Sequence, residues 1–255
     1  MSAPAIELRG VSKVYGAFTA LESIDLAVAP GEFVALVGGS GSGKTTLLKT
    51  INGLVHPDAG GVSVAGEEIA GLAPHLLRRR IGYVFQEVGL FPHLTVAENI
   101  AITPRLLGWD AARLTQRVTE LLTLVALSGD VARRSPSELS GGQRQRVGVA
   151  RALAAQPTLM LMDEPFGALD PITRDSLGGD YRAVHDRLGL TTIMVTHDIA
   201  EAVLLADRVV VLIGGRIRAD GTPADLLATT RDPEVLGLLE APRRQAERLR
   251  ERLGV

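Results

Sequence analysis

Gly38-Gly-Ser-Gly-Ser-Gly43-Lys44-Thr45 is the stretch that decides the fold. Its pattern of Gly, four residues, Gly, Lys and a hydroxyl residue is typical of loops that bind phosphate. The glycines let several backbone N–H groups point at one anion, and the helix predicted to follow adds its positive end. Lys44 is expected to reach the β- and γ-phosphates, and the Thr45 hydroxyl to bind Mg²⁺. The residues predicted to bind the nucleotide here are Gly38, Gly39, Ser40, Gly41, Ser42, Gly43, Lys44, Thr45 and Thr46.

Composition narrows the class of protein around this loop. The 255 residues carry a formal charge of −2, with 46 % hydrophobic and 22 % charged residues, as in an ordinary globular protein. The near balance of charge argues against nucleic-acid binding by a basic face. The absence of Cys excludes disulfides, thiolate nucleophiles and Cys-bound zinc. No apolar run approaches the roughly 20 residues of a membrane span, and the N-terminus lacks a signal-peptide pattern, so we expect a soluble cytoplasmic chain.

Short apolar runs that end in Gly or polar residues recur along the chain. They are Phe33–Val37, Ile81–Phe85, Leu159–Met162 and Thr192–Thr196. Such continuous runs are typical of strands buried on both faces, which predicts a parallel sheet covered by helices. Because ligands bind at the carboxyl ends of such strands, the polar residues that follow should share one edge.

Other segments depart from this pattern. The first 30 residues alternate between apolar and polar, which predicts an antiparallel β layer. Apolar residues spaced by three and four predict an amphipathic helix over 111–127, within a helical subdomain inserted at about 91–156. Gly178-Gly179 falls where a helix is expected, at a cost of roughly 1 kcal/mol each relative to Ala, and the sequence gives no functional reason for it. Residues 243–253 are expected to form a charged helix or a frayed end.

A carboxylate pair, Asp163-Glu164, ends one of the buried runs. Carboxylates at such a place are costly unless a metal or hydrogen bonds satisfy them. Asp163 is suited to the Mg²⁺ shell, and Glu164 to activating the attacking water as general base. The alternative is an acidic turn or helix cap before Pro165.

A second glycine-containing helix start lies at Ser140-Gly141-Gly142-Gln143. Ser140 and Gln143 have the spacing of a capping box, and capping alone is the simpler explanation. The two glycines leave the helix end bare of side chains, which suits a phosphate. A second anion-binding end in a chain that already has one phosphate loop suggests a nucleotide shared across a dimer.

In their order these motifs resemble the ATP-binding subunit of an ABC (ATP-binding cassette) transporter over nearly the whole chain. The resemblance rests on Gly38–Thr45, Gln86, Leu139–Gln143, Asp163-Glu164, Ala168-Leu169-Asp170 and His197. It implies an α/β fold with a phosphate-loop NTPase (RecA-like) core, a mainly parallel sheet, an N-terminal antiparallel β layer and an inserted helical subdomain. It also implies one cassette over residues 1–240, followed by a charged tail at 241–255.

The resemblance assigns further roles. Tyr15 corresponds to the residue that stacks on adenine, and His197 to the one that contacts the γ-phosphate and completes the catalytic set with Glu164 and Lys44. Gln86 corresponds to a residue that links the nucleotide and its Mg²⁺ to the membrane partner. Asp170 belongs to the nucleotide site in the family. Taken without the family, Tyr15 and His197 could equally be core or turn residues, and Asp170 a helix cap.

A narrower resemblance covers Val88–Ile100 and Pro104–Trp109, which is similar to importers of glycine betaine, choline and related osmoprotectants. It implies an ATP hydrolase on the cytoplasmic face of the inner membrane, with a second copy, two permease subunits and a separate solute-binding protein as partners. Polar amino acids or other trimethylammonium compounds are the alternative cargo, and a soluble non-transport ABC ATPase is an alternative class. The chain ends where many osmoprotectant ATPases continue into regulatory CBS repeats, so that regulation is not expected.

Apolar residues in the loop after Gln86 add one expectation. Val88, Leu90 and Phe91 stand where a loop should join a strand end to the helical subdomain. They could pack beneath the loop. The functional alternative is a partly exposed groove that receives a short helix of the membrane subunit.

Overall fold

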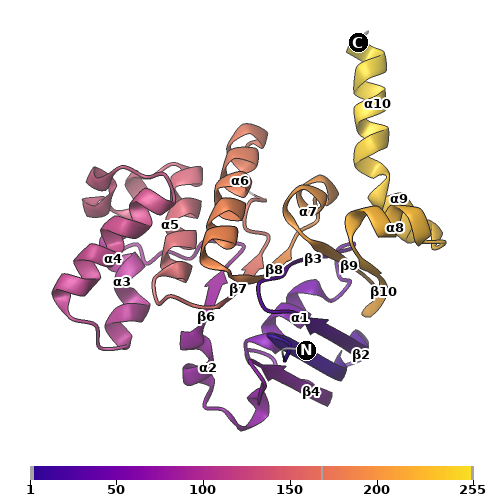
Figure 1. Cartoon of the computed structure of the whole chain (residues 1–255), viewed down its shortest axis with the longest axis horizontal. Coiled ribbons are helices and arrows are strands. Elements are labelled where there is room, and N and C mark those ends of the chain that lie inside the picture. Colours follow the sequence, from indigo (N-terminus) through magenta and orange to yellow (C-terminus); the bar gives the residue numbers. More distant parts are fainter. Residues whose placement is uncertain (1–2, 168, 254–255) are drawn as a thin grey trace.

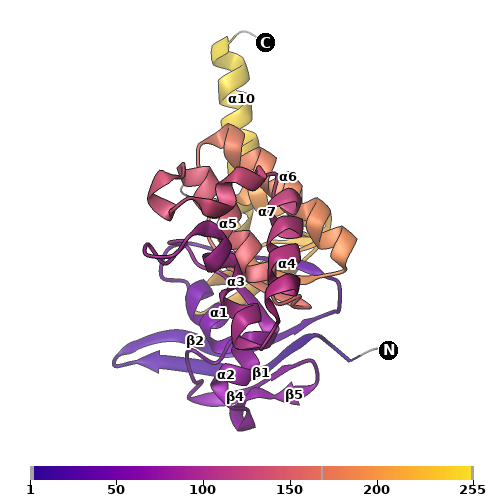
Figure 2. The ribbon, with the colours of Figure 1, turned by 90° about the vertical axis from the view of Figure 1, so that its left-hand side faces the viewer.

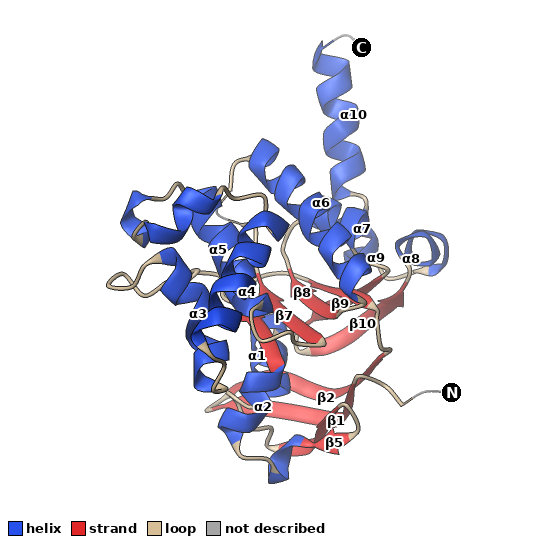
Figure 3. Ribbon diagram, turned by 60° about the vertical axis from the view of Figure 1, so that its left-hand side comes forward, coloured by secondary structure: helices blue, strands red, loops and turns tan. Residues whose placement is uncertain are grey.

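The computed structural model describes residues 3–167 and 169–253, arranged as two sheets with helices between and around them (Figures 1 and 3). The first sheet has the order β2-β1-β4-β5, and the second β10-β9-β3-β8-β7-β6. The strands are β1 Ile6–Tyr15, β2 Phe18–Val28, β3 Phe33–Val37, β4 Ala59–Val64, β5 Glu67–Glu68, β6 Ile81–Val84, β7 Leu159–Asp163, β8 Thr191–Val195, β9 Arg208–Ile213 and β10 Arg216–Gly221. The α-helices are α1 Lys44–Ile51, α2 Pro74–Arg80, α3 Val96–Leu106, α4 Ala111–Leu124, α5 Gly141–Leu153, α6 Pro171–Leu188, α7 Ile199–Leu205, α8 Pro223–Thr229, α9 Pro233–Leu239 and α10 Ala241–Leu253. Short 3₁₀ turns are η1 Ile69–Gly71, η2 Gly129–Arg133 and η3 Pro136–Glu138.

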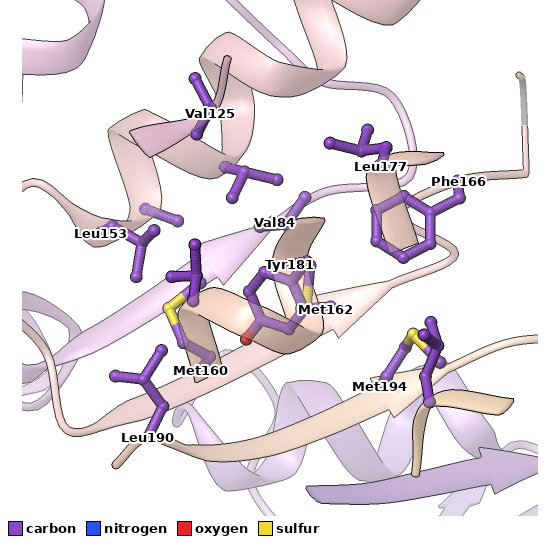
Figure 4. Close-up of a cluster of buried hydrophobic side chains, with 14 of the residues drawn as sticks. Val84, Val125, Leu153, Met160, Met162, Phe166, Leu177, Tyr181, Leu190 and Met194 are labelled. Carbon is purple, nitrogen blue, oxygen red and sulfur yellow. The ribbon is translucent and has the colours of Figure 1, made fainter. Parts of the chain in front are cut away.

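The six-stranded sheet is parallel except at β10, which pairs with β9 in the antiparallel sense. Alternate residues of β3 enter two different cores: Phe33 joins the helices α3–α7, and Val34 joins α1 and the N-terminal sheet. Figure 4 shows part of the first core, where Met160 and Met162 of β7 lie close to Tyr181 of α6. Burial on both faces explains the continuous apolar runs. The predicted parallel sheet is confirmed.

The N-terminal sheet is antiparallel, as the alternating sequence predicts. Ile6, Leu8 and Val11 are buried in the second core. Helix α1 lies between the two sheets and contacts strands of both (Figure 1). The phosphate loop, which ends where α1 begins, is therefore held from both sides.

Helices α3, α4 and α5 form the group expected between residues 91 and 156, and Figure 2 shows them side by side. The predicted helix over 111–127 ends three residues early, at Leu124. Ala126 has a left-handed backbone (φ 53°), which cannot continue an α-helix. Val125 nevertheless stays buried in the core, so the apolar spacing continued beyond the end of the helix.

Helix α10 extends away from the rest of the chain and buries none of its residues (Figures 1 and 2). It is helical to Leu253, so of the two expectations for this segment the charged helix is the one observed. Within residues 3–167 and 169–253, no helix combines the length and the apolar character needed to cross a bilayer.

The glycine pair Gly178-Gly179 lies inside α6, and the two glycines differ in their surroundings. A Cβ on Gly178 would lie 3.1 Å from Leu205 Cδ1 of α7, whereas a Cβ on Gly179 would meet nothing within 4 Å. Gly178 therefore permits the close packing of α6 on α7. Gly179 has no such packing reason.

Gly179→Ala is expected to stabilise the chain by about 0.5–1 kcal/mol, because alanine loses less backbone entropy in a helix and has free space here. Gly178→Ala is the matched control, since its new methyl group must displace Leu205. Urea unfolding followed by circular dichroism measures both. Equal stabilisation by the two substitutions would contradict the packing role of Gly178.

Candidate active site

The phosphate loop follows β3 and contains two glycines that pack tightly against neighbouring strands. Any other residue at these two positions would push its Cβ into a backbone carbonyl oxygen, so the backbone would have to shift. Gly38 has φ 150°, and a Cβ there would lie 2.1 Å from the Leu212 carbonyl oxygen of β9. Gly43 has φ 102°, and its Cβ would lie 2.3 Å from the Ala20 carbonyl oxygen of β2. The loop therefore packs between β9 of one sheet and β2 of the other, and these contacts hold its backbone conformation without a ligand.

Lys44, the first residue of α1, turns its side chain back into this loop. Its Nζ donates hydrogen bonds to the carbonyl oxygens of Gly38 (2.9 Å) and Gly39 (2.8 Å). Burial lowers the Lys44 pKa below its ordinary value, and the nearby carboxylates of Glu164 and Asp163 oppose that change. The ammonium group thus lies inside the loop, where an anion would meet it.

Thr45 and Asp163 meet between α1 and the end of β7. The Thr45 hydroxyl donates to Asp163 Oδ1 at 3.0 Å. Asp163 is buried, and burial raises the pKa of its carboxyl above the ordinary value. Hydroxyl and carboxylate oxygens are ligands that Mg²⁺ prefers, so this donor set fits the cation predicted from the sequence.

Side chains from two other loops converge on one oxygen atom of Glu164. Gln86 Nε2 donates to Glu164 Oε2 at 3.1 Å, and His197 Nδ1 lies 3.3 Å from the same oxygen. These residues follow β6, β7 and β8, so they share the carboxyl edge of the parallel sheet. Glu164 also has φ 45°, a left-handed conformation that is strained for a residue other than glycine. Strained backbone conformations of this kind are common at functional sites, where neighbouring residues hold the strained residue in place.

The start of α5 forms the predicted capping box. Ser140 Oγ accepts from the Gln143 backbone N–H (3.2 Å), and Gln143 Oε1 accepts from that of Ser140 (3.0 Å). A Cβ on Gly142 would lie 2.9 Å from Thr173 Cγ2, so packing on α6 accounts for this glycine without an anion. Gly141 is exposed, and its Cβ would meet only the end of a flexible Arg144. Ser140 and Gly141 thus remain open to an incoming group.

Two other predicted residues, Tyr15 and Asp170, are exposed. Tyr15 ends β1, with 48 % of its surface exposed and Lys13 Nζ 5.4 Å from its ring. Asp170 caps α6 by accepting from the Thr173 N–H at 3.0 Å. Hydrogen bonding to the side chain and then the backbone of Thr173 holds the pKa of its carboxyl below the ordinary value. Among the described residues, neither has a hydrogen bond to residues 38–45. Ala168 lies outside the described residues.

The loop after Gln86 is held by residues that the sequence analysis missed. Arg151 of α5 donates to the carbonyl oxygens of Val88 (2.5 Å) and Gly89 (2.7 Å), and the fully buried Asn99 binds both backbone groups of Phe91. Arg151 lies in no motif of the sequence analysis, and Asn99 lies in the stretch Val88–Ile100 without a role of its own, so only their contacts show what they do.

Of the three apolar residues in the loop after Gln86, Phe91 is the one that is clearly exposed. Val88 packs on Gly148 of α5 and Leu90 packs against the core, and both are half-buried, so packing beneath the loop describes these two. Phe91 is 45 % exposed and lines a groove of about 570 Å³. The groove is also lined by Arg78, Tyr83, Phe85 and Ile102.

Fold and site together define a phosphate-loop nucleotide-binding protein. Residues 21–167 match the family described as ABC transporter, and the chain belongs to this family. It is 52 % identical over 87 % of its length to the glycine betaine/carnitine/choline transport ATP-binding protein OpuCA of Bacillus subtilis, and 50 % identical over 87 % to the glycine betaine uptake system ATP-binding protein YehX of Escherichia coli. It spans 59 % of the length of OpuCA and 72 % of that of YehX.

Two solved structures agree with this assignment. The dimeric post-hydrolysis ATP-binding cassette MJ0796 bound to ADP and Pi superposes with a TM-score of 0.78 at 33 % identity, covering 85 % of this chain and 98 % of that one. The cbiO1 protein of Clostridium perfringens, part of the cbiONQ transporter complex, superposes with a TM-score of 0.83 at 27 % identity, covering 98 % of this chain and all of the other. The predicted α/β cassette fold is confirmed.

Proposed function

We propose that this chain is the ATP-hydrolysing subunit of an ABC importer, and that its cargo is a quaternary amine such as glycine betaine or choline. The observation that carries hydrolysis is the convergence of Gln86 and His197 on Glu164, on the sheet edge that also holds the phosphate loop. The cargo is supported by the glycine betaine, choline and carnitine transport proteins among the relatives.

The geometry assigns a role to each group. Lys44 exchanges its carbonyl partners for the β- and γ-phosphates, and Thr45 with Asp163 would hold Mg²⁺, which when bound neutralises phosphate charge. Gln86, proposed as a further Mg²⁺ ligand, is oriented by Glu164. Glu164 Oε2 accepts the proton of the attacking water, while His197 holds that oxygen in place.

ATP would be completed by a second copy of the chain. Ser140 and Gly141 at the exposed start of α5 supply hydrogen-bond donors to the γ-phosphate bound by the other subunit, with Gly142 and Gln143 shaping the turn. Tyr15 supplies an exposed aromatic face for adenine, and Asp170 contributes from the loop before α6. The dimeric state of the MJ0796 cassette supports this arrangement.

The remaining assignments concern assembly. Residues 1–240 form the cassette, 91–156 its helical subdomain, and 241–255 a charged tail, as the unburied α10 supports. In the dimer, the groove beside Phe91 of each copy docks one of the two permease subunits at the cytoplasmic face of the membrane. A separate solute-binding protein delivers the cargo to these permease subunits. Nucleic acid is not a proposed partner.

Uptake in cells tests both the hydrolysis and the cargo. A strain whose only copy carries Lys44→Ala is expected to lose uptake of radiolabelled glycine betaine, since the loop loses its phosphate-binding cation. Sulfate is the second cargo to measure, because the sulfate/thiosulfate import protein CysA of Caulobacter vibrioides is 53 % identical over 86 % of this chain. Loss of sulfate uptake with intact betaine uptake would replace the proposed cargo.

Phe91→Asp is expected to prevent assembly with the permease subunits while ATP affinity is unchanged, because a carboxylate in the apolar groove opposes docking of a helix. Leu227→Asp, at a similarly exposed position on α8, is the matched control. Co-purification from membranes beside an ATP-binding assay measures both. Intact co-purification of the Phe91→Asp chain would reject the docking role.

A further inference from the structure

One arginine of α6 joins the two loops that carry Glu164 and His197. Arg174 Nη1 donates to Asp198 Oδ2 at 2.9 Å, and its Nη2 donates to the Leu169 carbonyl oxygen at 3.2 Å. Leu169 lies five residues after Glu164, and Asp198 directly follows His197. The guanidinium thus holds both loops at once, through separate nitrogen atoms.

Asp198 divides its two carboxylate oxygens between two tasks. Oδ1 accepts from the backbone N–H groups of Ala200 (2.9 Å) and Glu201 (3.2 Å) and so caps α7, while Oδ2 holds Arg174. The Asp198 backbone N–H donates to Thr196 Oγ1 at 3.0 Å. His197 lies between these two anchored residues, so the position of its ring against Glu164 depends on where Asp198 is held.

Two buried polar atoms beside this ion pair are unsatisfied. Within the described part of the chain, Arg174 Nε and Glu201 Oε1 have no hydrogen-bond partner, although one is a donor and the other an acceptor. Glu201 is only 9 % exposed, and burial raises its pKa while the charge of Arg174 opposes that change. A hydrogen bond between a buried donor and a buried acceptor would stabilise both. Glu201 is close enough for the charge of Arg174 to act on its pKa, so Glu201 is a second carboxylate available to Arg174.

The same side chains border a cavity of about 390 Å³ between α6 and α7. Arg174, Asp198 and Glu201 line it together with Gly178 and Gly179. The glycine pair adds no side chain to the part of the α6 wall that it forms, which gives the guanidinium and Glu201 room to rearrange. This cavity supplies a reason for the pair that the sequence alone did not.

We propose that Arg174 is a positioning residue for ATP hydrolysis: it transmits the position of the loop at Leu169 to His197 through Asp198, and it gains Glu201 as a partner when that loop moves. The inference rests on the proposed hydrolytic function. Because Leu169 directly precedes Asp170, which is proposed to contribute to the nucleotide site, the link lets nucleotide binding set the position of His197 against Glu164.

The test uses two conservative substitutions that keep the fold. Arg174→Lys keeps the charge but cannot bind Asp198 and the Leu169 carbonyl oxygen together. Asp198→Asn keeps an oxygen to cap α7 but removes the charge that Arg174 holds. Each is expected to lower kcat for ATP by about tenfold or more, with KM and Tm nearly unchanged. Because both remove the same link, the double variant is expected to lose no more than the worse single one.

Arg182→Lys is the matched control on the same helix. Arg182 also binds an aspartate and a carbonyl oxygen, those of Asp207 (2.9 Å) and Leu205 (2.8 Å), but at the far end of α7. Its substitution is expected to leave kcat unchanged. A loss of kcat in Arg174→Lys no larger than that of this control, or one that only follows a fall in Tm, would overturn the positioning role.

A second readout separates this inference from the proposed hydrolysis. The NMR signal of the His197 ring, assigned with a His197→Gln chain, is expected to shift in Arg174→Lys and not in Arg182→Lys. A shift in a chain that binds but does not hydrolyse ATP would support the link and reject the hydrolytic function. An unmoved signal in a chain that hydrolyses ATP would reject the link alone.

Discussion

Glu164→Gln is expected to slow ATP hydrolysis by about 10²–10⁴-fold while ATP binding is retained, which is the usual contribution of a general base. The amide cannot take a proton from water, yet its oxygen can still accept from Gln86, so the three converging loops keep their arrangement. Single-turnover hydrolysis measured beside nucleotide affinity separates the two effects.

The matched control for this substitution is Glu87→Gln, an exposed carboxylate beside Gln86 that has no part in the cluster. It is expected to hydrolyse ATP at the normal rate. Near-normal hydrolysis by the Glu164→Gln chain itself would remove Glu164 from the role of base, and the chemistry would then have to be assigned to another group.

Ser140→Arg is expected to abolish the dimer that ATP and Mg²⁺ induce in the Glu164→Gln chain. Ser140 is exposed at the start of α5, where a long side chain would fill the approach of the phosphate held by the other subunit. Loss of the cap itself costs only about 1 kcal/mol, so the monomer remains folded. Light scattering with and without ATP measures the dimer.

Ser135→Arg distinguishes bulk at the phosphate from the loss of a cap. Ser135 and Glu138 form the same reciprocal capping box one turn earlier, before η3. This variant is expected to form the ATP-dependent dimer. If both chains dimerised alike, the shared nucleotide site would be refuted.

The parallel sheet could be predicted from the sequence because burial on both faces leaves a direct pattern, as in Phe33–Val37. The carboxyl edge could be predicted as well, because polar residues follow each of these strands. The end of α4 could not, since Val125 is apolar and buried although the helix has already ended at Leu124. The spacing of apolar residues predicts which side chains are buried. It predicts a helix only as far as the backbone keeps its helical conformation.

The contacts around the site were harder to predict for a similar reason. Arg174 binds Asp198 on another loop, and Arg151 binds the Gly89 carbonyl oxygen, so both act on groups distant in the sequence and no local pattern marks them. For Gly142 the structure adds packing on Thr173 as a second explanation beside the predicted anion, and the sequence pattern does not contain that contact. Spacing along the chain predicts partners within one helix turn, but not those on another helix.

The contacts of Lys44 have a consequence for product release. Its ammonium group already has the carbonyl oxygens of Gly38 and Gly39 as ligands in the structure described above. When phosphate leaves, the buried ammonium group of Lys44 is therefore not left without hydrogen-bond acceptors, because the two carbonyl oxygens accept its hydrogen bonds instead. Turnover becomes an exchange of oxygen ligands around a stationary charge, and the barrier to emptying the site is correspondingly lower.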